Sequence, residues 1–217
     1  MPNLKEVRTR IASVRSTQQI TSAMKLVAAS KLRKTQNAIL KLRPYALKLQ
    51  EILGNIAASG ETADLGPYTA NREPNKVLIV AFSSNKGLCG AFNTNVIKRT
   101  RSQIEGPYAP QFAAGNVELM TVGRKVSEFY IKRNYPVVER HDDIYHEVSF
   151  ESVSPLAEKL MQAFASGRYD RVILVYNQFR NAAVQKLVTE QYLPVEQLPA
   201  NKGDKPASHD FIFQPDR

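Results

Sequence analysis

The first 58 residues carry apolar side chains at the spacing of one long helix. Between Pro2 and Gly54 there is no glycine, Pro44 is the only proline, and Ala, Leu, Lys, Arg and Gln predominate. These residue types favour helices. A proline is tolerated in the first helical turn, and Gly54 with Gly60 marks the end. The pattern predicts a helix of about 55 residues, a rod of roughly 80 Å at about 1.5 Å per residue.

A heptad repeat runs through this segment when the positions are counted from Leu4. Twelve of its sixteen a and d positions are apolar or alanine: Leu4, Val7, Ile11, Val14, Ala28, Leu32, Ile39, Leu42, Ala46, Leu49, Leu53 and Ile56. An ordinary amphipathic core helix is the alternative, but such helices seldom exceed about 25 residues. We expect a left-handed coiled coil that Pro44 bends without ending. Its second strand must come from a copy of the chain, another protein or a further segment.

The a and d seam is interrupted by three polar residues, Gln18, Thr21 and Lys25. Over the same stretch, Ile20, Met24 and Val27 form an apolar stripe on another face of the helix. We interpret this stripe as the contact surface for a second partner, because methionine suits adaptable contacts. A local irregularity of the heptads without a partner is the alternative.

Residues 59–75 are rich in Gly, Pro, Asn and Thr and are typical of a linker. Beyond them, short apolar runs alternate with amphipathic segments. Strands are predicted at residues 76–82, 117–122, 136–139, 171–177, 186–192 and 210–213, and helices at residues 94–103, 124–133 and 153–166. This alternation predicts an α/β domain with a mostly parallel sheet over residues 76–217, joined to the long coiled-coil helix of residues 1–58.

The segment between the first strand and the first helix of this domain, residues 83–93, is rich in small residues and glycine. Backbone N–H groups in such a turn can hold a phosphate. Its sequence matches neither GxGxxG nor GxxxxGK[ST], so we interpret it as a tight structural turn rather than a nucleotide site. Cys89 within it has no evident activating base, and we expect it to be a small buried residue.

Two other clusters contain reactive side chains. Five potential metal ligands lie close together: His141, Asp142, Asp143, His146 and Glu147. Their spacing fits no metal site template, and a polar surface loop is our interpretation. Ser208, His209 and Asp210 are adjacent in sequence, which argues against the geometry of a catalytic triad. We therefore expect no catalytic residues, no cofactor and no metal.

Charge is divided unevenly along the chain, which has a net charge of +10. Residues 1–60 have a net charge of +9, with Glu6 and Glu51 as the only acids, whereas the rest of the chain is close to neutral. A basic helix can bind nucleic acid, and that is the alternative function. Against it, the first 44 residues contain no aromatic side chain, and the basic residues form no single face. No apolar run approaches the roughly 18 residues that a membrane-spanning helix needs.

Two stretches resemble the gamma subunit of F-type ATP synthase. Residues 11–34 read IASVRSTQQITSAMKLVAASKLRK, followed by RPYA at residues 43–46, and both are similar to that family's N-terminal helix. Residues 84–93, SNKGLCGAFN, are similar to the turn after the first strand of its Rossmann-like domain. The resemblance covers the whole chain.

The resemblance implies a rotor shaft without chemistry of its own, which couples ion-driven rotation to ATP synthesis or hydrolysis. Its partners would be the ring of alpha and beta subunits, the epsilon subunit and the membrane c-ring, at the cytoplasmic face of a bacterial membrane. It also implies that the family's second long helix would begin near Arg217. Two groups of contact residues follow by resemblance: Ile20, Met24, Lys25, Val27 and Lys31 near acidic beta-subunit loops, and Phe211, Phe213 and Gln214 near the c-ring. Gln214 stands where the family often has Glu.

Overall fold

The computed structural model describes residues 3–58, 66–145 and 148–195. They divide into two compact units, Met1–Ile56 and Ala57–Arg217. Within the described ranges, no helix is both long enough and apolar enough to cross a membrane.

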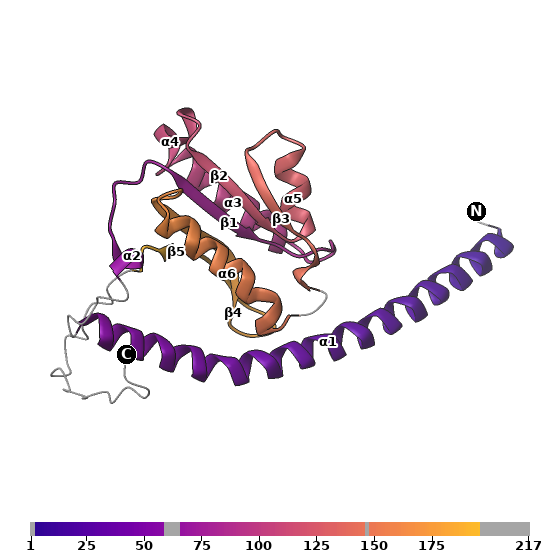
Figure 1. The fold of residues 1–217 in the computed structure, drawn as a ribbon. Coiled ribbons are helices and arrows are strands. Elements are labelled where there is room, and N and C mark those ends of the chain that lie inside the picture. Colours follow the sequence, from indigo (N-terminus) through magenta and orange to yellow (C-terminus); the bar gives the residue numbers. More distant parts are fainter. Residues whose placement is uncertain (1–2, 59–65, 146–147, 196–217) are drawn as a thin grey trace. The chain divides into compact units, whose positions relative to one another are not determined.

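The first unit is a single helix, α1 (Leu4–Ala58), and Figure 1 shows it as one smooth arc. Asn3 starts it: its carbonyl accepts the Val7 N–H at 3.2 Å and its side-chain Oδ1 accepts the Lys5 N–H at 3.3 Å. The helix passes through Pro44 without a break. A proline inside a helix removes one backbone hydrogen bond, but strong helix formers on both sides continue the ladder. The predicted long helix is confirmed, and its end agrees with the sequence pattern.

The second unit alternates strands and helices, as the sequence predicts. Its elements are α2 (Gly66–Thr69), β1 (Val77–Phe82), α3 (Phe92–Glu105), α4 (Ala109–Ala113), β2 (Val117–Val122), α5 (Arg124–Ile131), β3 (Val137–His141), the 3₁₀ turn η1 (Asp143–Tyr145), α6 (Phe150–Ala165), β4 (Arg171–Phe179) and β5 (Gln185–Leu193). The short elements α2, α4 and η1 have no periodic pattern and were not anticipated.

One sheet organises this unit, with the strand order β3-β2-β1-β4-β5. The pairs β1–β2, β1–β4 and β2–β3 are parallel, and β5 runs antiparallel to β4. The mostly parallel sheet is therefore confirmed. The last predicted strand, at residues 210–213, lies outside the described residues.

Side chains of β1 point alternately to the two faces of the sheet and pack in two separate cores. Val77, Ile79 and Ala81 pack with residues of α3 and α5 on one face of the sheet. Leu78 and Val80 pack on the other face with Leu156, Leu160 and Phe164 of α6, the helix coloured orange in Figure 1. A strand buried on both faces is expected at the centre of a parallel sheet. This arrangement places the carboxyl ends of β1 and β2, and the turns that follow them, at one edge of the sheet.

Part of the segment predicted as a linker belongs to the α/β unit. Tyr68 of α2 packs against the core on the α6 side, and its carbonyl accepts the Val195 N–H at 2.9 Å. The guanidinium of Arg72 donates to the Phe164 carbonyl at 3.2 Å and lies 5.2 Å from the centre of the Phe164 ring. The composition of residues 59–75 indicates loop, but tertiary contacts order its second half.

Candidate functional site

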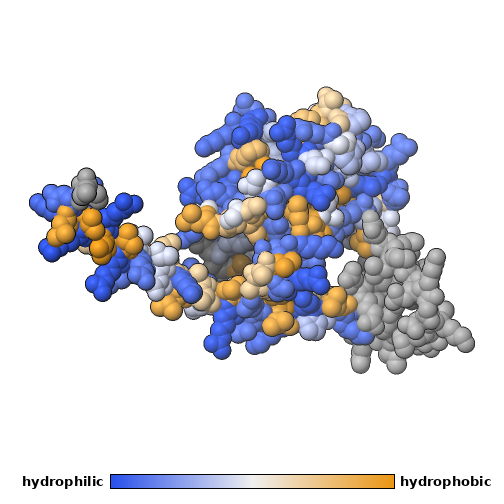
Figure 2. Space-filling model, turned by 180° about the vertical axis from the view of Figure 1, so that it is seen from behind, coloured by the Kyte–Doolittle hydropathy of each residue, from blue (hydrophilic) through white to orange (hydrophobic). Residues whose placement is uncertain are grey.

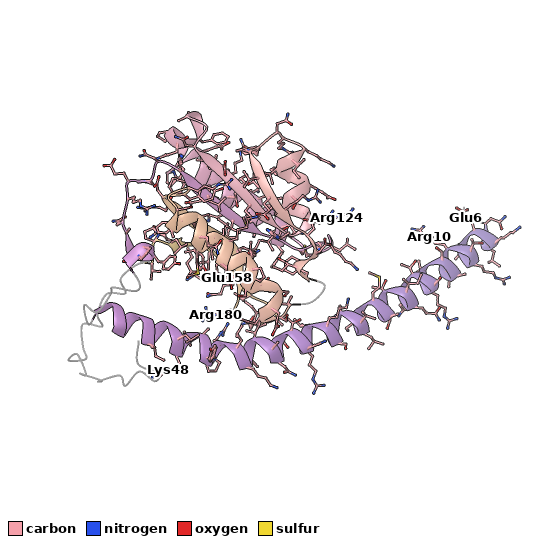
Figure 3. All side chains as sticks on the ribbon, in the orientation of Figure 1. Glu6, Arg10, Lys48, Arg124, Glu158 and Arg180 are labelled. Carbon is pink, nitrogen blue, oxygen red and sulfur yellow. The ribbon has the colours of Figure 1, made fainter. Side chains whose placement is uncertain are left out.

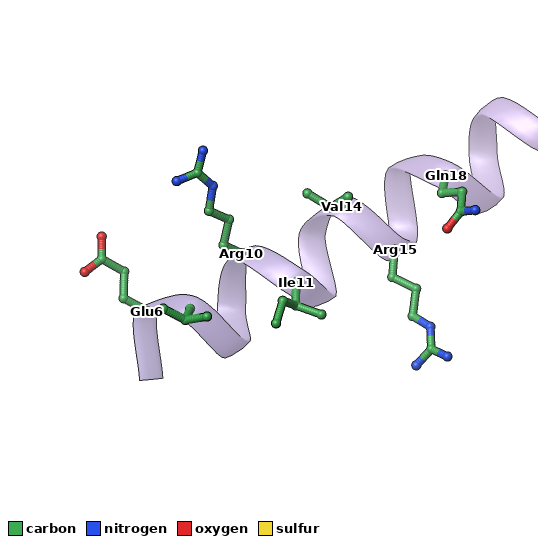
Figure 4. Close-up of a pocket in the computed structure, with 7 residues that line it drawn as sticks. Glu6, Arg10, Ile11, Val14, Arg15 and Gln18 are labelled. Carbon is green, nitrogen blue, oxygen red and sulfur yellow. The ribbon is translucent and has the colours of Figure 1, made fainter. Parts of the chain in front are cut away.

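The a and d seam of α1 contains two consecutive hollows. The first is lined by Glu6, Val7, Arg10, Ile11, Val14, Arg15 and Gln18. The second is lined by Ser13, Val14, Thr17, Gln18, Thr21, Ser22 and Lys25. Figure 4 shows Ile11 and Val14 between the side chains of Arg10 and Arg15, which project to opposite sides of the helix. Such hollows between seam residues accept the side-chain knobs of a second helix.

Apolar side chains of this seam are largely open to solvent in the described structure. Ile11 is 61% exposed and Val14 is 62% exposed. Figure 2 shows apolar groups set among polar ones at the N-terminal end of α1, at the left of the view. Exposed apolar side chains in a continuous row mark an interaction surface. The seam is therefore a candidate site for a helical partner.

Two threonines of the α1 seam use their hydroxyl groups within the helix. The Thr21 hydroxyl donates to the Thr17 carbonyl at 2.7 Å, and the Thr35 hydroxyl donates to the Lys31 carbonyl at 3.0 Å. Both residues stand at d positions of the heptad repeat. Because each hydroxyl hydrogen is used within the helix, the methyl group remains for packing against a partner.

The stripe predicted on another face of α1 is present and exposed. Ile20 is 60% exposed, Met24 56% and Val27 58%. At about 100° per residue, Lys31 lies on the same side as this stripe. Lys25 does not, because it lines the second seam hollow with Gln18 and Thr21. The five predicted contact residues of α1 are thus divided between two faces, as their heptad positions already indicate.

Positive charge surrounds both surfaces. Figure 3 shows side chains that project from α1 between its N-terminal end and Lys48, Arg10 among them. Between Leu4 and Leu49 the basic residues are Lys5, Arg8, Arg10, Arg15, Lys25, Lys31, Arg33, Lys34, Lys41, Arg43 and Lys48, and Glu6 is the single acid. An acidic surface would complement this helix and be attracted to it over long range.

Within the α/β unit, the turn of residues 83–93 is closed by its own side chains. The Asn93 side chain accepts the Ser84 N–H at 2.9 Å and donates to the Lys86 carbonyl at 3.2 Å. The Ser84 hydroxyl donates to the same Lys86 carbonyl at 2.6 Å. These bonds fold the turn back on the start of α3. The structural turn predicted from the sequence forms in this way.

The first turn of α5 lies beside this loop, where a helix N-terminus can bind an anion. Its N–H groups are already taken by residues 83–85. The Arg124 N–H donates to the Asn85 side chain at 2.9 Å, the Lys125 N–H to the Ser84 carbonyl at 3.2 Å, and the Val126 N–H to the Ser83 hydroxyl at 2.9 Å. The chain's own atoms therefore occupy the N–H groups through which this helix N-terminus could bind an anion.

The predicted burial of Cys89 is wrong, because this residue is exposed. Leu88 and Gly90 on either side both have positive φ, at 58°. These two turns carry the tip of the loop away from the core, and Leu88 is 99% exposed. A leucine in the left-handed region is strained. The apolar, strained and exposed Leu88 is a candidate contact residue that no periodic pattern identified.

Within the acidic and histidine cluster after β3, Asp142 has a structural role. Asp142 accepts hydrogen bonds from the Arg140 guanidinium and, at 2.8 Å, from the Ser127 hydroxyl. Burial opposes ionisation of Asp142, but these two bonds outweigh it and hold the pKa of the carboxyl below its ordinary value. No group of three metal-ligating side chains occurs within the described residues. His146 and Glu147 lie outside them.

We expect calorimetric titration of this chain with Mg-ATP to give no saturable heat. The turn of residues 83–93 lacks a phosphate-binding motif, and the α5 N–H groups beside it are occupied by the chain's own atoms. Saturable binding that the substitution Asn93→Ala weakens would contradict this, because it would place the nucleotide at the turn. Lys48→Ala, on α1, is the matched control.

Several predicted residues lie outside the described part of the chain. They are the c-ring contact residues Phe211, Phe213 and Gln214 and the reactive neighbours Ser208, His209 and Asp210.

Comparisons with known proteins cover the whole chain. The family model described as ATP synthase matches residues 3–217. The ATP synthase gamma chain of Christiangramia forsetii is 46% identical over 217 residues, which are 100% of this chain and 73% of that protein. The ATP synthase gamma chain of Flavobacterium johnsoniae is also 46% identical, with the same two coverages.

Solved structures give the same result. A chain of the central stalk and c-ring of Tetrahymena thermophila mitochondrial ATP synthase is 26% identical with a TM-score of 0.61, over 83% of this chain and 80% of that chain. A chain of the Euglena gracilis mitochondrial ATP synthase rotor has a TM-score of 0.54 over 88% of this chain and 62% of that chain. At 19% identity, the second likeness supports the fold alone. This protein belongs to the ATP synthase gamma-chain family.

Proposed function

We propose that this gamma chain is the rotor of a bacterial F-type ATP synthase and couples ion-driven rotation to ATP synthesis or hydrolysis in a ring of alpha and beta subunits. The observation that carries the proposal is α1, one continuous helix with two exposed apolar surfaces on different faces. The chain has no chemistry of its own in this role. It acts by presenting different surfaces to the subunits around it.

The two faces of α1 have different tasks in this mechanism. The seam, with Ile11 and Val14, holds a second helix and stiffens the shaft. The stripe of Ile20, Met24 and Val27 with Lys31 stays free to meet acidic loops of the beta subunits. A rotating asymmetric rod can drive a catalytic site only if its contacts differ between the conformations of that site. A stripe on one side of the rod satisfies that requirement.

The α/β unit forms the foot of the rotor in this proposal, beside the epsilon subunit and the c-ring at the cytoplasmic face of the membrane. Phe211, Phe213 and Gln214 contribute contacts near the c-ring. Support comes from the family membership and from a structural relative named for a central stalk and c-ring.

No observation favours the alternative function, nucleic-acid binding. Family membership accounts for the basic helix without it. The basic side chains also lie around α1 rather than on one face, as Arg10 and Arg15 illustrate in Figure 4.

The test is assembly of the chain with alpha and beta subunits from one bacterium, followed by native mass spectrometry and ATP hydrolysis assays. We expect one copy of the chain per ring. Lys31→Glu should preserve assembly and change the hydrolysis rate roughly fivefold or more, because a lost charge contact of about 1 kcal/mol corresponds to that factor.

Lys98→Glu is the matched control for this experiment, since it reverses one exposed lysine on α3 of the α/β unit. It should leave the hydrolysis rate unchanged. A chain that fails to assemble with the ring would contradict the proposed function. Equal effects of the two reversals would show that overall charge, rather than the stripe, matters.

A further inference from the structure

The seam of α1 changes chemistry between its two hollows. The seam residues Val7, Ile11 and Val14 line the first hollow. Farther along the helix, the floor of the second is formed by Gln18, Thr21 and Lys25. A helix that packs along the whole seam must therefore bury polar groups at one point.

Only two of these polar groups need a partner. Thr21 donates its hydroxyl hydrogen to its own helix, as does Thr17 on the rim of the hollow, to the Ser13 carbonyl at 3.0 Å. Among the described residues, no hydrogen bond or ion pair involves the side chain of Gln18 or Lys25. Glu6, the single acid of this part of α1, is nineteen positions from Lys25, about 28 Å along a helix.

A buried ammonium is costly unless it is paired. Lysine is a donor only, and a carboxylate is the partner that satisfies both its charge and its hydrogens. A polar residue at one seam position is also known to fix the register of two helices, since sliding leaves it unpaired. The chemistry of this hollow therefore selects among helices with equally apolar seams.

We propose that the helix packed on the α1 seam carries a carboxylate side chain against Lys25, and that this pair sets the axial register of the two helices. Gln18 accepts or donates the remaining hydrogen bond one heptad away, about 10.5 Å along the axis. The inference rests on the proposed function only in that a second helix packs on this seam. It adds the chemistry of that helix and the point at which it is aligned.

Lys31 provides an internal control that the chain itself offers. It carries the same charge on the same helix, less than two turns from Lys25, but lies on the face of the Ile20, Met24 and Val27 stripe. A general attraction between the basic helix and an acidic peptide would involve both lysines equally. Seam pairing involves Lys25 alone.

The experiment uses the full chain and three synthetic helical peptides of about 35 residues with leucine at their other seam positions. They differ only at the central seam position, which is Glu, Gln or Lys. Binding is measured by fluorescence anisotropy, at chain concentrations that ultracentrifugation shows to be monomeric. We expect the Glu peptide to bind the unchanged chain about tenfold more tightly than the Lys peptide.

Lys25→Glu should reverse this order, so that the Lys peptide binds more tightly, whereas Lys31→Glu should leave the preference intact. Equal binding of all three peptides overturns the inference while leaving helix pairing in place. An equal loss of preference in Lys31→Glu also overturns it, since the effect would be general attraction. If none of the peptides binds, helix pairing on the seam fails, and the inference fails with it.

Discussion

A chain with Gly123→Ala should lose about 4 kcal/mol of its free energy of unfolding. Gly123 has φ of 104°, a region that residues with a side chain rarely adopt. A Cβ at this position would stand 2.1 Å from the Ser83 carbonyl oxygen and 2.8 Å from its carbon. Both atoms belong to backbone at the end of β1, so the clash can be relieved only by moving that strand or the start of α5.

Urea unfolding followed by tyrosine fluorescence measures this effect, since the chain has nine tyrosines and no tryptophan. Gly115→Ala is the matched control: its φ is also positive, at 76°, but nothing lies within 4 Å of its Cβ position. It should cost only about 1 kcal/mol of backbone strain. Similar losses for the two variants would show that φ alone decides, and that the contact between Gly123 and Ser83 is unimportant.

Replacing Ile11 and Val14 together by lysine should weaken the binding of a second helix to the α1 seam more than a hundredfold. These two side chains form the apolar floor of the first seam hollow. Each is worth about 1.5–3 kcal/mol when a partner buries it, and two added charges repel the basic helix itself. Fluorescence anisotropy with the helical peptide that carries Glu at its central seam position measures the loss. Unfolding of the α/β unit should not change, because it is a separate compact unit.

Leu26→Lys is the control for this double substitution. Leu26 is 72% exposed, and the helical period places it on neither the seam nor the stripe. It should reduce binding of the peptide little. If the seam variant binds the peptide as tightly as the unchanged chain does, then no second helix packs over Ile11 and Val14 and the heptad interpretation is wrong.

Most helices and strands could be predicted because the local spacing of apolar residues indicates them. The span of β2 was predicted to the residue, and β1 to within one residue. Both lie between turn residues, β1 as a continuous apolar run and β2 as an apolar run interrupted only by Glu118 and Thr121. The length of α1 followed from the absence of glycine over residues 3–53. Elements without a pattern were missed: α4 has five residues and α2 four, too few for a helical period to appear.

Sequence by itself determined the division of this protein into a long basic helix and an α/β unit, together with its family, because repeated spacing and contiguous motifs are properties of the chain. Tertiary structure alone decided which groups meet. Ser83 and Val126 are 43 positions apart, yet the Ser83 hydroxyl accepts the Val126 N–H at the start of α5 and helps fill an anion-binding position. Cys89 was expected to be buried, but it is exposed beside Leu88, which has a positive φ. The separate faces of Lys25 and Lys31, by contrast, already follow from the sequence, because six positions of a helix rotate one lysine by about 120° from the other.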